Sequence, residues 1–179
     1  MGLARRILFT KDPARNAVLR IVDRGGSRVV EERRFDQPLA SIEAAKLYGD
    51  DRITYLVSVD YSVGMGSYNG PYTSLLEVAL GKMKWLEAID KVTGKAEPIL
   101  VMDSLKTMWK VADAPSGTAK DILQAACRPD FASLDDVSFI LILTRYSFDG
   151  KNWVKLERHE KGFAELDDLY ALLGRKPFP

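Results

Sequence analysis

The sequence predicts a mainly β fold in which antiparallel hairpins form a sandwich or a half-barrel, with two or three short helices at its margins. Apolar and β-branched residues recur in short segments, glycine-containing turns separate these segments, and no regular alternation of strands with helices is present. Strands joined by short turns pair antiparallel, because parallel neighbours need long crossover connections. We expect residues 1–179 to form a single globular domain, since domains cluster around roughly 100–200 residues.

Residues 17–35 predict the first hairpin. Segment 17–22 is apolar and β-branched, segment 28–31 returns, and the two glycines of 24–27 tolerate the positive φ of a tight turn. The returning segment continues through four consecutive charged residues at 31–34. Such charges discourage pairing with a further strand, so we expect an edge or a solvated end of a sheet here.

Two segments predict the short marginal helices. Segment 41–48 contains good helix formers and ends at Gly49, which is typical of a helix followed by a glycine stop. Segment 165–173 predicts a second, terminal helix, which Gly174 and Pro177 would end.

Segment 52–62 alternates with period two, which predicts a half-buried strand. We expect one set of side chains to face the core and the other set to face solvent. The expected core set is Ile53, Tyr55, Val57, Val59 and Tyr61, and the opposite set is Thr54, Ser58, Asp60 and Ser62.

Segment 72–93 supports two interpretations. Residues 74–77 fit a capping box, and the apolar residues that follow fit a helical stripe, which would make 74–93 a long helix and the fold α+β. Gly81 inside this segment would cost a helix about 1 kcal/mol relative to alanine. We favour two strands joined by a turn at Gly81, although the pattern alone leaves the helix open.

The later part of the chain again has the character of strands. Segments 97–102 and 107–111 are rich in apolar residues, and a second hairpin joins 137–148 to 151–158. Its connection, Asp149-Gly150, is a strong sequence signature of a tight two-residue turn.

Charge and hydropathy narrow the range of partners. The chain carries 26 Lys plus Arg and 25 Asp plus Glu, so no overall field attracts nucleic acid or anionic lipid. No apolar run approaches the roughly 18 residues that a membrane-spanning helix requires. We therefore expect a small molecule or a protein as partner, with no nucleic acid and no membrane, and the oligomeric state stays open.

Cys127 is the only cysteine, which excludes a disulfide within the chain and a cysteine-based metal site. We expect no cofactor and no metal. A single thiol is compatible with the cytoplasm, and also with the periplasm if a signal peptide preceded Met1.

The glycine-rich segment 64–71 follows a predicted strand, as a dinucleotide-binding loop would. Its glycines are one residue out of step with the G-x-G-x-x-G pattern, and Pro71 follows where a helix should open. The segment therefore predicts a surface loop. Met65 and Tyr68 would be costly to expose without use, so we list both as candidate contacts for a ligand or partner.

Three tryptophans, Trp85, Trp109 and Trp153, lie in separate predicted strands. Aromatic side chains can form platforms for sugars or peptides, although tryptophans in small β proteins more commonly pack in or near the core. We add Trp85 and Trp153 to the candidate contacts.

Two classes of function follow. The favoured class is a non-enzymatic binding or structural module, because no nucleophile motif, phosphate loop or ligand cluster is present. The alternative is a metal-free hydrolase that uses carboxylates or the pair Cys127 and His159. Against that pair, Cys127 lies in an apolar setting typical of a buried thiol, and His159 lies in a run of charges typical of a solvated strand end.

Overall fold

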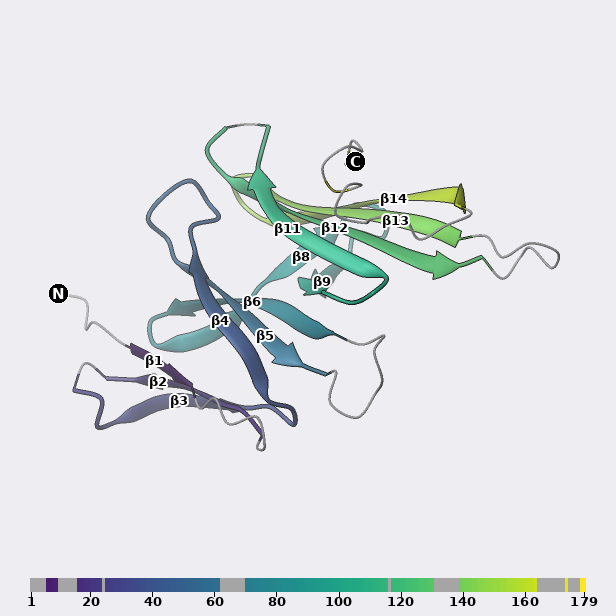
Figure 1. The fold of residues 1–179 in the computed structure, drawn as a ribbon. Coiled ribbons are helices and arrows are strands. Elements are labelled where there is room, and N and C mark those ends of the chain that lie inside the picture. The colour runs from purple at the N-terminus through teal and green to yellow at the C-terminus, as the bar shows by residue number, and fades with distance from the viewer. Residues whose placement is uncertain are drawn as a thin grey trace.

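The computed structural model consists of β-strands arranged in three sheets that lie one above another (Figure 1). The described residues are 6–9, 16–23, 25–61, 70–115, 117–130, 139–163, 173 and 178–179. The prediction of a mainly β, antiparallel fold of stacked sheets is confirmed, and among these described residues every strand pair but one is antiparallel.

Sheet A is the predicted first hairpin with one additional strand. Its order is β1 (Arg6–Phe9), β2 (Val18–Val22) and β3 (Val29–Arg34). Gly26 has a φ of 73° in the turn between β2 and β3, as the sequence predicted for this connection. The charged strand β3 lies at the edge of the sheet, which confirms the edge prediction.

Sheet B lies in the middle of the stack. Its order is β10 (Leu100–Met102), β6 (Pro71–Ala79), β5 (Thr54–Asp60) and β4 (Leu39–Ala45), and β7 (Lys82–Trp85) also pairs with β6.

Sheet C contains the second predicted hairpin, which is formed by its third and fourth strands. Its order is β11 (Thr107–Asp113), β12 (Lys120–Pro129), β13 (Phe139–Phe148), β14 (Trp153–Phe163), β8 (Glu87–Asp90) and β9 (Ala96–Pro98). The pair β14 and β8 is the parallel exception.

Three apolar clusters hold the layers together. The first lies between sheets A and B and includes Leu19, Val57 and Leu76. The second lies between sheets B and C and is built from buried residues such as Leu75 and Ile122. The third covers the other face of sheet C and consists of Ala125, Cys127, Leu141, Leu143 and Leu173. Sheet B is therefore packed on both faces.

The chain passes from sheet B to sheet C at Leu86 and returns at Ile99. Each of these residues separates two strands of different sheets, and both are buried. The Leu86 amide donates to the Leu75 carbonyl at 2.9 Å, and the Ile99 amide donates to the Leu86 carbonyl at 3.0 Å. The two crossings therefore lie side by side where the sheets diverge, which is the region where hollows form.

The helix predicted for 41–48 is wrong, because residues 41–45 belong to β4 and residues 46–48 are not helical. Ile42 packs against the cluster between sheets A and B, whereas Ala45 packs against the cluster between sheets B and C. Only an extended backbone can place apolar side chains on both faces of a sheet, so tertiary packing overrides the local helix propensity.

Gly49 also has a different role from the predicted helix stop. Its φ is 78°, and a Cβ at this position would lie 2.3 Å from the Thr118 carbonyl oxygen. Glycine is needed here because the backbone of the 117–119 turn approaches closely.

The long helix considered for 74–93 does not form. The segment is instead β6, β7 and β8, with a tight turn at Leu80 and Gly81, whose φ angles are 51° and 79°. Two consecutive positive φ angles are typical of a hairpin turn whose twist matches that of its strands. In the predicted terminal helix 165–173, Leu173 is helical and buried, and the other residues of that segment lie outside the described residues.

The expected half-burial of the central strand is wrong, since β5 is buried on both faces. Val57 and Val59 are buried as predicted, but so are Thr54 and Leu56 on the opposite face. Ile53, expected in the core, precedes the strand and is 40% exposed. The reason is the stacking of sheets A and C on either side of sheet B, which the period of one strand does not reveal.

Candidate functional site

The larger described hollow lies at the crossing between sheets B and C, and we call it the Tyr48 pocket. It has a volume of about 340 Å³. Its aromatic wall is Tyr48, Trp85, Phe148 and Trp153, and its polar lining is Arg52, Glu77, Lys84, Glu87, Lys151 and Asn152. The pocket combines apolar ring faces with donors and acceptors of both charges.

The aromatic wall is fixed by ring contacts and by one hydrogen bond. The Tyr48 ring lies edge-on to Phe148 with centroids 4.6 Å apart, and to Trp153 at 5.6 Å. The Trp153 Nε1–H donates to the Tyr48 hydroxyl at 2.9 Å. Aromatic pairs in such geometry contribute about 0.5–1.5 kcal/mol beyond their buried area, so the wall is pre-formed.

A guanidinium lies over this wall. The Arg52 Cζ atom is 3.8 Å from the centroid of the Tyr48 ring, and its Nε–H donates to the Asp50 carboxylate at 2.8 Å. The backbone N–H of Arg52, together with this side-chain bond, lowers the pKa of Asp50. Arg52 is exposed, so its remaining donors face the solvent side of the pocket.

The predicted Asp149-Gly150 turn brings the end of the second hairpin to the pocket. Gly150 has a φ of 97°, and the Asp149 carboxylate accepts from the amides of Lys151 and Asn152 at 2.9 and 2.7 Å. These backbone bonds lower the pKa of Asp149. A local turn signature thus positions Phe148 and Asn152 on either side of the loop.

Glu77 is the least expected member of the lining. It lies on the same face of β6 as the buried Leu75, opposite Lys84 of β7, and its Oε1 atom is buried with no hydrogen-bond partner among the described residues. Burial, and then the hydrogen bond with Glu77, raises the pKa of Tyr48 to about 12. The carboxylate therefore presents a buried acceptor beside a hydroxyl that stays protonated.

The four candidate contacts from the sequence have different outcomes. Trp85 and Trp153, far apart in the chain, line the same pocket. Trp85 is partly buried and packs against the cluster between sheets A and B, whereas Trp153 is only 3% exposed and mainly supports Tyr48. Met65 and Tyr68 lie outside the described residues.

Sequence reasoning missed Tyr48, Arg52 and Glu77. Tyr48 is the last residue of the segment predicted as a helix, Arg52 is the first residue of the predicted strand 52–62, and nothing local connects them to Trp153. Glu77 could have been found from one sequence feature. If 71–79 is a strand, the alternation of side chains places Glu77 on the same face as the apolar Leu75. A lone acid on such a face needs a partner.

The thiol and imidazole considered for nucleophilic catalysis are not brought together. Cys127 pairs with Leu141 and packs on the outer face of sheet C, whereas His159 pairs with Ile142 and points to the opposite face. Neighbouring strand residues alternate between faces, so the sheet itself separates the two groups. The His159 Nε2 atom lies 2.6 Å from the Glu157 carboxylate instead.

We expect the Cys127 thiol to react at least about tenfold more slowly with a thiol reagent in the native protein than after denaturation. Cys127 is buried, and burial raises the pKa of its thiol, which lowers the reactive thiolate fraction. The chain has no other cysteine, so the denatured sample is the internal control. Rapid native labelling with a midpoint below the free-thiol value would contradict the burial.

Within the described residues, no helix has the length and apolarity needed to cross a membrane. The same part of the chain contains no group of three or more histidine, cysteine, aspartate or glutamate side chains arranged to hold a metal ion. Comparison with protein-family models, with curated proteins and with solved structures found no match to this chain.

Proposed function

We propose that this protein is a non-enzymatic binding module whose Tyr48 pocket takes a saccharide. The observation that carries the proposal is the unpaired, buried Oε1 of Glu77 in a pocket that Tyr48 and Phe148 line with aromatic rings. A saccharide presents hydroxyl donors on its edge and an apolar C–H face, which are the two features that this wall complements.

The size of the pocket supports a small ligand. Pockets for small molecules have volumes of roughly 300–1,000 Å³, and the Tyr48 pocket, at about 340 Å³, is at the lower end of that range. It is therefore suited to one sugar ring of a longer chain or to a monosaccharide.

The Glu77 carboxylate supports the choice of a hydroxylated ligand. A buried acceptor without a partner costs about 1–3 kcal/mol, and a ligand O–H that donates to it would recover that cost. A ligand without donors would leave Glu77 Oε1 unsatisfied, so purely apolar molecules are disfavoured.

The aromatic wall supports the choice of a ligand with a C–H face. The face of an aromatic ring carries negative charge and attracts the partly positive hydrogens of C–H bonds. Around the ring, Lys84, Lys151 and Asn152 can donate to ligand oxygens. Arg52, held over Tyr48, adds a planar donor at the same rim.

The test is a titration of the protein with glucose and with glucuronic acid, followed by amide chemical shifts in NMR spectra. We expect shifts at Glu77, Lys84 and Asn152, and we expect Glu77→Gln to weaken binding about tenfold, because a charge-assisted hydrogen bond exceeds a neutral one by about 1.4 kcal/mol. The absence of shifts at these residues with both sugars would contradict the proposal.

Glu87→Gln is the matched control. It makes the same chemical change at the same pocket, but Glu87 is exposed and its carboxylate is already solvated. We expect less than a twofold change in affinity. Equal losses in Glu77→Gln and Glu87→Gln would indicate a general charge effect and would count against a specific role for Glu77.

The hydrolase alternative draws on the same two acids, since Glu77 and Glu87 both line the pocket. Glycoside hydrolysis requires one carboxyl group as proton donor and a second on the other side of the scissile bond. The test is whether the wild-type protein releases reducing sugar from an oligosaccharide. If it does, and if Glu77→Gln and Glu87→Gln both abolish this release, the protein is a hydrolase.

A further inference from the structure

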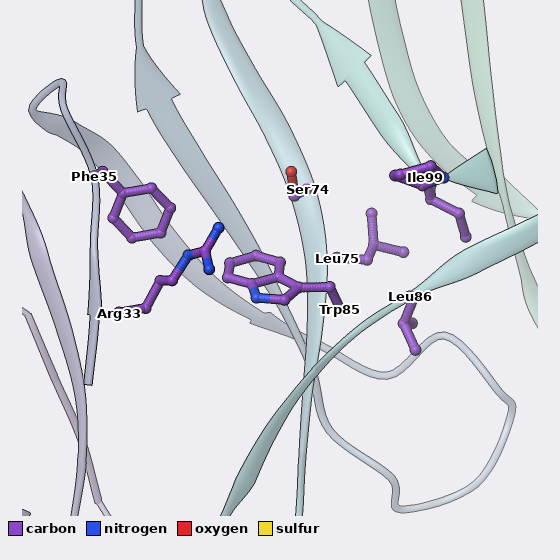
Figure 2. Close-up of a pocket in the computed structure, with 8 residues that line it drawn as sticks. Arg33, Phe35, Ser74, Leu75, Trp85, Leu86 and Ile99 are labelled. Atoms are coloured by element: carbon purple, nitrogen blue, oxygen red, sulfur yellow. The ribbon is translucent and has the colours of Figure 1, made fainter. Parts of the chain in front are cut away.

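A second hollow, which we call the Arg33 pocket, lies on the other side of Trp85. It has a volume of about 220 Å³ and opens between sheet A and the crossing at Leu86 and Ile99. Its lining is apolar apart from one guanidinium, Arg33, and one hydroxyl, Ser74. Figure 2 shows the Arg33 side chain extending toward the Trp85 indole below the Phe35 ring, and all three residues line the hollow with Ser74.

The charged run of β3 is divided between the two faces of sheet A. Glu32 accepts from both Arg20 and Arg34 at 2.7 Å, which forms an ion-pair cluster on one face. Arg33 pairs in register with the buried Leu19, so it faces sheet B instead. The sequence shows the four charges as one solvated edge. Arg33 is indeed exposed, and strand alternation places its side chain at the rim of the hollow.

Arg33 differs from its neighbours in having no carboxylate partner among the described residues. Glu31, on the same face, accepts from the Met83 backbone N–H at 2.5 Å, and Glu32 is engaged on the other face. A guanidinium presents five donors in a planar fork that matches a carboxylate. Beside an apolar cavity, such a fork marks a place for an anionic group attached to an apolar body.

We propose that the Arg33 pocket binds a small organic carboxylate with an apolar body. The Arg33 fork takes the two carboxylate oxygens, and the Ser74 hydroxyl donates to the same group. The body packs against Trp85, Leu86 and Ile99. Backbone hydrogen bonds at the crossing between the sheets hold Leu86 and Ile99 in place. The site shares the Trp85 and Leu86 walls with the Tyr48 pocket but does not depend on saccharide binding there.

The volume fits an aromatic acid of one ring. An engineered apolar cavity of about 150 Å³ holds benzene, so the 220 Å³ of the Arg33 pocket can hold one ring with a short carboxymethyl arm. The edge-on contact of Phe35 with Trp85, with centroids 6.1 Å apart, leaves the wall rigid. Phenylacetate is therefore the probe, and phenylacetamide is its uncharged counterpart of nearly equal shape.

The experiment is a calorimetric and NMR titration of the full chain with both probes. We expect phenylacetate to shift the signals of Ser74, Ile99 and the Trp85 indole N–H, and to bind at least tenfold more tightly than phenylacetamide. Equal affinities would overturn the proposal, because the guanidinium would then contribute nothing. Failure of phenylacetate to bind would overturn it as well.

Two adjacent substitutions separate a specific fork from general charge. Arg33→Gln should weaken phenylacetate binding at least tenfold, and Arg33→Lys should restore only part of it, since a lysine cannot make the paired bonds. Arg34→Gln removes the same charge on the opposite face and should change the affinity less than twofold. Equal losses in Arg33→Gln and Arg34→Gln would overturn the assignment.

The two sites can fail independently. Glu77→Gln should leave phenylacetate binding unchanged, and Arg33→Gln should leave sugar binding unchanged, because neither residue lines the other pocket. Loss of both ligands in either variant, with an unchanged thermal unfolding midpoint, would show a single coupled site and would overturn the assignment of a separate carboxylate pocket.

Discussion

Replacing Val57 with aspartate is expected to lower the free energy of unfolding by about 4 kcal/mol. Val57 is 1% exposed, and its side chain lies in the cluster between sheets A and B. A carboxylate there would lie among uncharged groups, since its neighbours in register are Ile42 and Ser74 and its cluster is apolar. The substitution would therefore bury an unpaired charge or force its protonation.

Urea denaturation followed by circular dichroism measures this loss. Ile53→Asp is the control, because it introduces the same charge one residue before the same strand at a position that is 40% exposed. We expect the control to change stability by less than about 0.5 kcal/mol. A loss below about 1 kcal/mol for Val57→Asp would show that sheets A and B do not pack face to face here.

Replacing Gly70 with alanine is expected to cost about 3 kcal/mol. Gly70 is buried where the chain enters β6, and a Cβ on its backbone would lie 1.5 Å from the Asp103 carbonyl oxygen and 2.6 Å from the Asp103 carbonyl carbon. Both obstructing atoms belong to the backbone, so no side-chain rotation can relieve the overlap. The strands β6 and β10 would have to move apart.

Thermal and chemical unfolding of Gly70→Ala test this close approach. Gly25→Ala is the matched control, because its Cβ would meet nothing nearer than 3.6 Å and its φ is not in the left-handed region. We expect the control to stay within about 0.5 kcal/mol of the wild type. Equal stabilities of Gly70→Ala and Gly25→Ala would refute the packing of Gly70 against Asp103.

The Gly70 contact changes the view of the glycine-rich segment 64–71. The sequence suggested a surface loop, and residues 62–69 lie outside the described residues. Its last glycine is nevertheless buried and packed against another backbone segment. Shortening the loop through Gly70 would therefore disturb sheet B.

The hairpins were predictable because their determinants are local. Gly26 and Gly150 both adopt the positive φ that their turns require, and the apolar strands on either side follow directly. Two strands, and not one helix, were predicted within 74–93 for the same local reason. Gly81 is indeed a turn residue between β6 and β7. Trp85 and Trp153, two of the candidate contacts taken from the sequence, line the same pocket, and their role as contacts stays a prediction.

The strand-rich character, the tight turns and the charged edge strand could be predicted from the sequence, because each depends on residues within a few positions of one another. Three features follow from the packing of the layers: residues 41–45 form a strand, β5 is buried on both faces, and Tyr48 meets Trp153 across 105 positions of the chain. These outcomes depend on which sheets stack on which faces. Contacts between layers join segments that carry no local sign of one another, so the pockets at the crossings of Leu86 and Ile99 appear only when the sheets are assembled.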